Sequence, residues 1–384
     1  MLQLALGGLL ALAIAMGIGR FMYTPLLPFM EAGLGLSKSE AGLIASANYL
    51  GYMIGALLAA SPFLPGSRRA WMLLGLAVSA LTTAATGLVS DMWPMMSLRF
   101  FGGVASAFVL VFCSALVVTR LSMGGFARLT SLHFAGVGSG IVLSAVLVSI
   151  LASFGVDWRQ MWLVAGGVSL IALLLVSHLV RADATAPSGS GLVTGRAPPM
   201  LWILIVSYGL FGFGYVITAT FVVSMVRSLE EVRSIEPIIW LVVGLAAAPS
   251  VWFWSIIARR MGLIAAYAVA FIVEAVTIAI GIFSPTITGL LVTAVGLGGT
   301  IVGITALGLM AAGDLSRRDP RLTMALMTAS FGLGQVVGPT FGGVIADRTG
   351  SLALPSLIAS AVLIIGALLV FWRLTVEHRQ ARRH

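Results

Sequence analysis

An arginine stands inside the first apolar run of this chain, where a charged side chain is costly. Arg20 lies in the stretch "GIGRFMYTPLLPFM", residues 17–30. Placing such a group within a membrane costs about 2.5–3.5 kcal/mol on insertion scales, and a function or a partner is needed to offset it. Either Arg20 binds an anionic or polar group of a solute, with Tyr23 on the same helical face, or it donates to backbone carbonyls that Pro25 and Pro28 leave free.

Three further ionisable side chains within apolar runs could handle charge or protons. Arg99 lies six residues after Trp93 and either faces the interior or extends to the outer surface. Glu274 is an acid in mid-run, which either carries a coupled proton or bonds a neighbouring helix as a neutral group. His133 is a second proton-relay candidate, because histidine titrates near physiological pH; one turn before Gly136, it is equally suited to packing.

Uncharged polar side chains at helical spacing are weaker candidates for binding a substrate. Asn48 and Tyr52 lie one turn apart, and Tyr208 and Tyr215 lie seven residues apart, so each pair shares a helical face. Gln335 stands alone in a later run. These groups either contact a solute or bond one another between helices.

Sequence signatures of an enzyme are missing. The chain has no phosphate-binding Gly-Lys loop, no metal-spaced His or Cys cluster and no nucleophile beside a base. We therefore expect no enzymatic activity, no cofactor and no metal, and ATP-driven transport would need a partner subunit. The single cysteine, Cys113, lies in an apolar run and is expected to be a small packing residue.

The elements that position these residues are apolar runs long enough to cross a bilayer. The 384 residues are 59% hydrophobic and only 9% charged, which indicates an all-α membrane protein. The first run has no preceding basic segment and continues to Met30, so it fits a spanning helix better than a cleaved signal. Twelve transmembrane helices are predicted, near 3–31, 41–60, 70–90, 94–119, 129–155, 160–180, 200–226, 237–258, 262–283, 286–311, 322–345 and 353–373.

A stretch rich in Pro, Gly, Ser and Thr divides these runs into two sets of six. It predicts a cytoplasmic linker over residues 181–199, between bundles at 1–180 and 200–373, and residues 374–384 form a basic cytoplasmic tail.

Arginines concentrate in the loops on the side of the linker and in the tail. This asymmetry predicts that both termini are cytoplasmic, in a bacterial inner (plasma) membrane, and it explains the net charge of +9 without nucleic acid. Tryptophans near the run ends are expected to anchor the protein at the membrane interfaces. They are Trp93, Trp158, Trp162 and Trp240.

The two halves resemble each other at an offset of about 195–198 residues, and Arg20 in the first half meets Tyr215 in the second. The matching residues are Gly17 with Gly212, Gly19 with Gly214, Met30 with Met225, Gly136 with Gly334 and Gly140 with Gly338. Small residues four apart let helices approach closely in lipid, so these glycines are expected to pack helix against helix.

This organisation resembles the major facilitator superfamily. Arg99 and Gly103 in "RFFGGVASA" look like the helix-4 motif of that family. The stretch "GQVVGPTFGG", residues 334–343, is similar to the Gly-Pro motif of proton antiporters, although that motif belongs to helix 5, where this chain has Ile141. The loop "PGSRR", residues 65–69, keeps two arginines and lacks the aspartate of the family loop motif.

The stretch over residues 17–30 looks more narrowly like the opening of the YbfB/YjiJ-like branch. The resemblance implies that helices 1, 4, 7 and 10 line a central cavity, and that Arg99 faces it and tunes a proton-coupling group. It implies a monomeric secondary transporter in the lipid bilayer, exporting a small-molecule substrate in exchange for protons by alternating access, with no nucleic acid partner. The alternatives are proton-symport uptake of an anionic solute, and a non-transporting receptor or scaffold.

Overall fold

Each apolar run predicted from the sequence overlaps a helix of the structure. The computed structural model describes residues 1–61, 64–180, 198–316 and 320–381, so most of the predicted linker lies outside the described residues. The first half contains α1 (Leu2–Leu12), η1 (Ala13–Phe21), α2 (Tyr23–Leu34), α3 (Lys38–Ala60), α4 (Arg68–Thr86), α5 (Met92–Met123), η2 (Ala127–Leu129), α6 (Thr130–Ser153) and α7 (Trp158–Leu179). The second half contains α8 (Pro199–Ser228), η3 (Glu230–Ile235), α9 (Glu236–Ala247), α10 (Ser250–Met261), α11 (Leu263–Phe283), α12 (Ile287–Leu315), α13 (Pro320–Thr349) and α14 (Ala353–Ala381).

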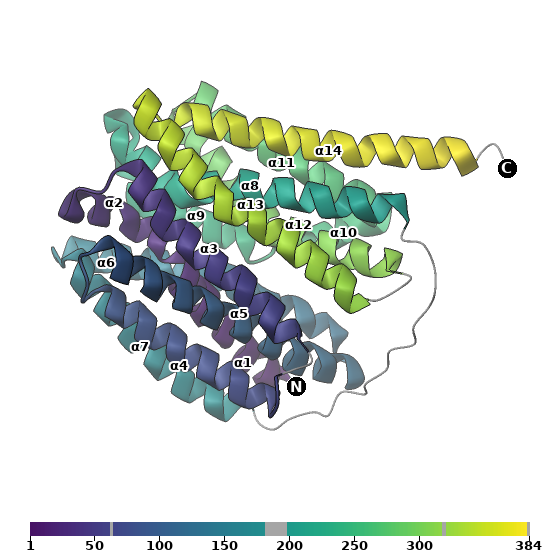
Figure 1. Cartoon of the computed structure of the whole chain (residues 1–384), viewed down its shortest axis with the longest axis horizontal. Helices are drawn as coiled ribbons and strands as arrows, with labels where there is room; N and C mark the ends of the chain where they lie inside the picture. The colour runs from purple at the N-terminus through teal and green to yellow at the C-terminus, as the bar shows by residue number, and fades with distance from the viewer. Residues whose placement is uncertain (62–63, 181–197, 317–319, 382–384) are drawn as a thin grey trace.

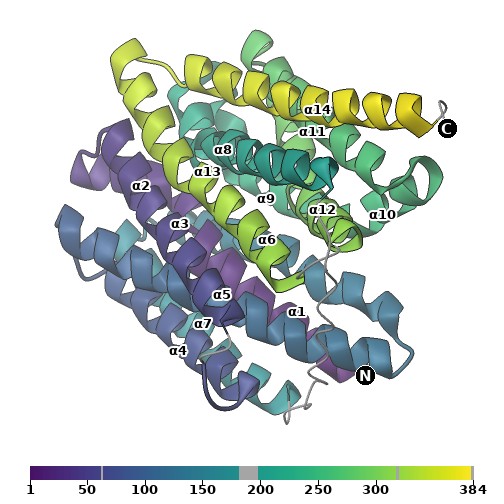
Figure 2. The same ribbon diagram turned by 45° about the vertical axis from the view of Figure 1, so that its right-hand side comes forward.

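Most of these helices are long and apolar enough to cross a membrane. Within the described part of the chain there are ten such helices, the first formed by α1, η1 and α2 together. The segment formed by η3 and α9 meets α10 at a bend of 45°, and the two together would count as an eleventh span. α13 has 30 residues but a more polar composition, and it lies between α3 and α8 (Figure 2).

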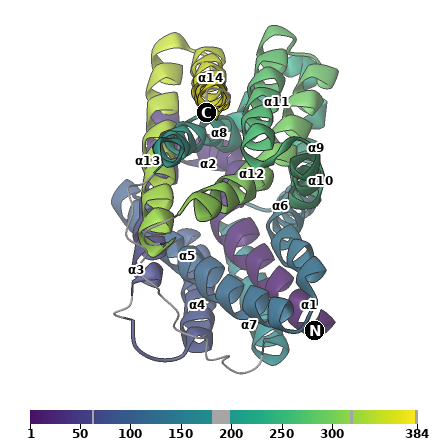
Figure 3. The ribbon, with the colours of Figure 1, turned by 90° about the vertical axis from the view of Figure 1, so that its right-hand side faces the viewer.

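The helices form two groups that follow the order of the chain. α1 to α7 lie together and α8 to α14 lie together; in Figure 1 the C-terminus is at the far right and the N-terminus is low in the middle of the view. In Figure 3 the first group lies below the second. The helix α14 continues to Ala381, so the first residues of the predicted tail extend a helix.

The first span is interrupted by a π-helical segment. Residues 13–21 form η1, and the ordinary α-helix resumes at Tyr23. Pro25 follows the end of this segment and has no N–H to donate. The backbone carbonyls where the π-helix changes to the α-helix therefore have one amide donor fewer than in an ordinary helix.

Glycines set the closest helix contacts within each half, and the prediction of glycine packing is confirmed. A Cβ built on Gly17 would overlap the backbone of Gly140 in α6, and one on Gly334 would overlap the carbonyl of Gly209 in α8. In the first half the first predicted span packs against the fifth, which is α6. In the second half the seventh span, α8, packs against the eleventh, α13, as the sequence offset predicts.

Glycines also bring the two halves into contact. A Cβ on Gly42 of α3 would overlap the carbonyl of Pro339 in α13, and one on Gly138 of α6 would overlap the amide of Ala248 after α9. Two helix pairs, α3 with α13 and α6 with α9, therefore join the halves backbone to backbone.

The tryptophan prediction is wrong for three of the four residues. Trp158, Trp162 and Trp240 are buried within the bundles, and only Trp93 of the four is exposed. The indole N–H of Trp162 lies 3.4 Å from the sulfur of Met30 in α2. A tryptophan near the end of a span can lie on either side of its helix. Its place in the sequence therefore does not predict whether its side chain faces the lipid or the bundle interior. Cys113 is a free, buried cysteine, as expected.

Replacing Gly140 by Ala is expected to lower the thermal stability of the detergent-solubilised protein. The added methyl group would overlap the backbone of Ala13, and overpacking of this kind costs about 1–3 kcal/mol. The matched control is Gly167→Ala, because nothing lies within 4 Å of a Cβ at that position and alanine favours the helix. Thermal unfolding followed by size-exclusion chromatography measures both; equal stability of the two variants would contradict the packing argument.

Candidate functional site

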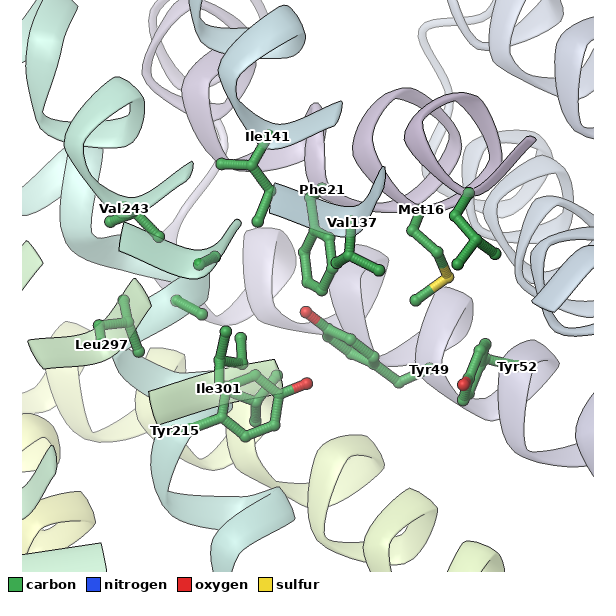
Figure 4. Packing of buried hydrophobic residues seen from close by; sticks show 14 of the residues in the cluster. Met16, Phe21, Tyr49, Tyr52, Val137, Ile141, Tyr215, Val243, Leu297 and Ile301 are labelled. Atoms are coloured by element: carbon green, nitrogen blue, oxygen red, sulfur yellow. The ribbon is translucent and has the colours of Figure 1, made fainter. Parts of the chain in front are cut away.

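The two halves face each other around a group of tyrosines near the middle of the spans. Figure 4 shows Tyr49 and Tyr52 from α3 on one side and Tyr215 from α8 on the other, with Phe21 of η1 nearby. All four side chains are buried, and Tyr52 is the most accessible of them at 8%.

Arg20 is buried among these rings with part of its guanidinium unbonded. Its central carbon lies 3.9 Å from the ring centre of Tyr52 and 4.7 Å from that of Tyr49, in cation–π geometry. Nε and Nη2 have no hydrogen-bond partner, and no carboxylate of the described residues forms an ion pair with Arg20. The aromatic faces therefore hold the cation, and two of its donors are buried without a hydrogen-bond partner.

Arg99 takes the backbone role that the sequence left open for Arg20. Its Nη1 donates to the carbonyl of Gly19 and its Nη2 to the carbonyl of Arg20, both at 3.0 Å. The amide of Asn48 donates in turn to the carbonyl of Arg99 at 2.8 Å. Arg99 therefore fixes the backbone of the π-helical segment that carries Arg20, and Asn48 bonds the backbone of Arg99.

Tyr23 faces Arg99 rather than Arg20. Its hydroxyl donates to the carbonyl of Ala41 at 2.9 Å, and its ring centre lies 5.3 Å from the guanidinium carbon of Arg99. The expectation that residues three apart share a face assumes an α-helix, and the π-helical turns just before Tyr23 change that register.

The second half contributes a ladder of stacked rings. The ring of Phe331 in α13 lies 4.6 Å from Tyr208 at an interplanar angle of 18°, and 5.8 Å from Tyr215 at 6°. Phe211 stacks on Tyr215 at 4.9 Å. The side-chain amide of Gln335 donates to the hydroxyl of Tyr215, and its carbonyl oxygen has no partner. Three of the candidates predicted from the sequence thus lie in one cluster.

The sequence did not single out Tyr49, Thr218 or Thr220. Tyr49 lies beside both Arg20 and Thr220, a residue of the opposite half. The hydroxyl of Thr218 is buried without a hydrogen-bond partner. The only signal for Tyr49 was its position three residues before Tyr52, which places both rings on one face of α3.

His133 and Glu274 lie inside their own halves. His133 packs against Gly8 of α1, and its Nε2 is 3.0 Å from the hydroxyl of Ser114 in α5. Glu274 of α11 is fully buried beside Thr300 of α12, and neither carboxyl oxygen has a hydrogen-bond partner.

Polar contacts join the halves at the end of the spans that is remote from the chain termini. The carboxylate of Asp347 in α13 accepts from the backbone amides of Lys38 and Ser39, at 2.9 and 2.8 Å, and so caps the first turn of α3. Glu31 pairs with Lys38 at 2.7 Å and accepts from the hydroxyl of Ser224 in α8. This end is therefore closed by hydrogen bonds between the halves.

Comparison with known proteins gives matches to transporters. A family model described as "Uncharacterised MFS-type transporter YbfB" matches residues 12–371. The uncharacterized transporter YycB of Bacillus subtilis (strain 168) is 25% identical over 362 residues, covering 89% of this chain and 86% of that protein. The uncharacterized MFS-type transporter YceJ of the same strain is 28% identical over 164 residues, and that match spans 43% of this chain and 42% of YceJ.

Two solved structures show the same fold. The nucleoside transporter NupG is 15% identical with a TM-score of 0.77, over 96% of this chain and 99% of that one. A bacterial homolog of the human lysosomal transporter Spinster, in an inward-facing and unoccupied conformation, is 15% identical with a TM-score of 0.68, over 96% of both chains. The matched proteins are transporters and not enzymes, in agreement with the sequence.

Replacing Arg99 by Gln is expected to destabilise the protein more than replacing Arg20 by Gln. The first substitution removes two hydrogen bonds to buried carbonyls, each of which contributes about 1.5–3 kcal/mol when the donor is charged. The second removes cation–π contacts with Tyr49 and Tyr52 and two donors that have no hydrogen-bond partner. Thermal unfolding in detergent tests the contrast, and a larger loss for Arg20→Gln would contradict the assignment of backbone support to Arg99.

Proposed function

Because this chain belongs to the family of the uncharacterised MFS-type transporter YbfB and is a membrane transporter of that type, we propose that it exports a small organic solute in exchange for protons. In this proposal the halves formed by residues 1–180 and 200–373 rock against each other around one central site, in a bacterial inner membrane. One observation carries it: a buried guanidinium with free donors lies where side chains of both halves meet.

A solute bound to Arg20 would contact both halves. Tyr49 and Tyr52 belong to the first half and contact Arg20, and Tyr215 of the second half lies across from them in Figure 4. A ligand that bonds both halves stabilises the conformation in which they are close, so its binding energy shifts the balance between conformations. Substrate contact by Arg20, Tyr49, Tyr52, Tyr208, Tyr215 and Gln335 is part of the proposal; Tyr23, Asn48 and Arg99 support Arg20.

We include twelve spans and cytoplasmic termini in this proposal. The count reaches twelve when the bent pair at 230–261 and α13 are each taken as one span. The arginine-rich loops lie at the end with the chain termini, which supports a cytoplasmic position by the positive-inside rule. The end closed by Asp347 then faces the opposite side of the membrane, and the conformation is closed to the outside.

Glu274 is the proposed carrier of the coupled proton. An unpartnered carboxyl within a bundle is costly to ionise, and a change in its surroundings during rocking would change its proton affinity. His133 has a hydrogen-bonded neighbour in Ser114 and is the second candidate.

Proteoliposomes containing the purified protein are expected to couple solute movement to an imposed pH gradient. Uridine, benzoate and choline serve as neutral, anionic and cationic probes, and a pH-sensitive dye inside the vesicles reports protons. Arg20→Gln is expected to lower the flux at least tenfold, because the guanidinium is the site's free donor, and Arg20→Lys is expected to retain part of it. A gradient that drives no flux of any probe class, or full flux in Arg20→Gln, would count against the proposal.

A reversible cross-link between α3 and α13 is expected to stop transport. The hydroxyls of Ser46 and Thr340 lie 2.8 Å apart across the halves, so cysteines at these positions can form a disulfide that holds the closed end shut. Ser46→Cys with Thr340→Cys, made in a Cys113→Ser background, should lose flux under oxidation and regain it with a reductant. Each single-cysteine variant is the control. Undiminished flux in the cross-linked protein would exclude rocking at this end.

A further inference from the structure

We propose that the solute is a planar aromatic monocarboxylate, with its carboxylate on Arg20 and its ring against the aromatic ladder of the second half. The inference rests on the proposed transport function and names the substrate class of the same site. Three features of the site carry it: the unbonded edge of one guanidinium, the stacked rings that face it, and unbonded polar atoms beside those rings.

The free donors of Arg20 have the geometry of a carboxylate site. Nε and Nη2 are neighbours on one edge of the guanidinium, and an edge of this kind donates two parallel hydrogen bonds to the two oxygens of a carboxylate. The ring of Tyr52 covers a face of the guanidinium and leaves that edge unbonded. A carboxylate would bond both donors at once and compensate a buried cation that has no acidic partner in the described part of the chain.

The number of free donors favours an anion with one carboxylate. Arg99 is the other buried arginine in the described residues of the first half. Its two Nη groups donate to the carbonyls of Gly19 and Arg20, and only its Nε is unbonded. Arg20 therefore offers the pair of adjacent free donors that a carboxylate needs. A phosphate monoester or a dicarboxylate would bring a second negative charge into the bundle without a partner, which is costly in a low-dielectric interior.

The ring ladder favours a flat, aromatic body. Tyr208, Phe331 and Tyr215 stack with interplanar angles of 18° and 6°, and Phe331 keeps 8% of its surface accessible. Figure 4 shows the ring of Tyr215 across from Tyr49 and Tyr52, so this end of the ladder faces the rings around Arg20. An added aromatic ring continues such a stack, and aromatic pairs gain about 0.5–1.5 kcal/mol beyond the burial of their area. A saturated ring of the same size lacks this gain.

Unbonded polar atoms beside the ladder suit a hydroxyl substituent on the ligand ring. The side-chain carbonyl of Gln335 accepts no hydrogen bond, and Thr218 has a free hydroxyl one turn from Tyr215 on α8. A phenolic hydroxyl can donate to the first and accept from the second. The geometry thus points to hydroxylated aromatic acids as the members of the class that bind best.

Binding of matched probes to the purified full-length protein tests the inference. Benzoate and 4-hydroxybenzoate carry the proposed groups, cyclohexanecarboxylate keeps the charge and the size but is not planar, and benzylamine reverses the charge. Thermal stabilisation measured against probe concentration gives each affinity. We expect benzoate to bind at least threefold tighter than cyclohexanecarboxylate, 4-hydroxybenzoate to bind tighter than benzoate, and benzylamine not to bind.

Variants test the carboxylate contact at Arg20 and the ring contact at Phe331 separately. Arg20→Gln should weaken benzoate and cyclohexanecarboxylate alike, at least tenfold, because both lose the same ion pair. Phe331→Leu should weaken benzoate to the affinity of cyclohexanecarboxylate and leave the latter unchanged, because it removes stacking alone. Cys113→Ser, a buried position in α5, is the control and should leave every affinity unchanged. Unfolding of each variant without probe confirms that it is folded.

The outcomes distinguish this inference from the proposed function. Equal affinity of benzoate and cyclohexanecarboxylate would overturn the aromatic requirement, and tighter binding of benzylamine would overturn the charge, while flux of uridine or choline in proteoliposomes would leave the transport proposal intact. If Phe331→Leu unfolds, Phe331→Met tests the same stacking with a smaller change in volume. Unchanged benzoate binding in that variant would also overturn the ladder assignment.

Discussion

Two hydrogen bonds from Arg99 to the carbonyls of Gly19 and Arg20 fix the backbone of the first span at the residue whose guanidinium lies among the tyrosines. The π-helical segment and Pro25 leave carbonyls without an amide partner, and in lipid an unsatisfied carbonyl costs several kcal/mol. Arg99 supplies the missing donors from α5. Because this second arginine satisfies the backbone, the side chain of Arg20 is not required for that purpose and keeps two donors unbonded.

The two halves use matching positions for different chemistry. The sequence offset pairs Arg20 with Tyr215, and both side chains are buried where the halves meet. The first half supplies a cation held by Tyr49 and Tyr52, and the second supplies stacked rings around Phe331. Glycines at matching positions pack the same pairs of helices in each half, and the main difference between the matching spans is the π-helical segment at residues 13–21, which α8 lacks.

The sequence predicted the parts of this structure that depend on composition and on regular spacing. The apolar runs predicted the helices, and the glycines at 136, 140, 334 and 338 predicted close contacts between them. It also identified Arg20, Tyr52, Tyr208, Tyr215 and Gln335 before their clustering was visible. It did not predict the direction of Tyr23 or the support from Arg99, because a period of 3.6 residues fails across a π-helical segment. Contacts between halves, such as that of Tyr49 with Thr220, have no signal in the local sequence.

Hydrogen bonds between the halves connect the tyrosine cluster with the closed end, and they indicate how ligand binding at the cluster would move that end. Thr24 of α2 donates to the carbonyl of Ala219 in α8, about one turn beyond the residues that carry Arg20 and Tyr215. Further along, Ser224 of the same helix bonds Glu31, and Asp347 caps α3. Helix α8 is therefore a continuous connection from Tyr215 to Ser224, whereas the π-helical segment ends between Arg20 and the start of α2. A ligand that displaces Tyr215 must also move the Ser224 end of α8, because an intact helix moves as one body, and the break before α2 is where the first span can absorb a displacement of Arg20.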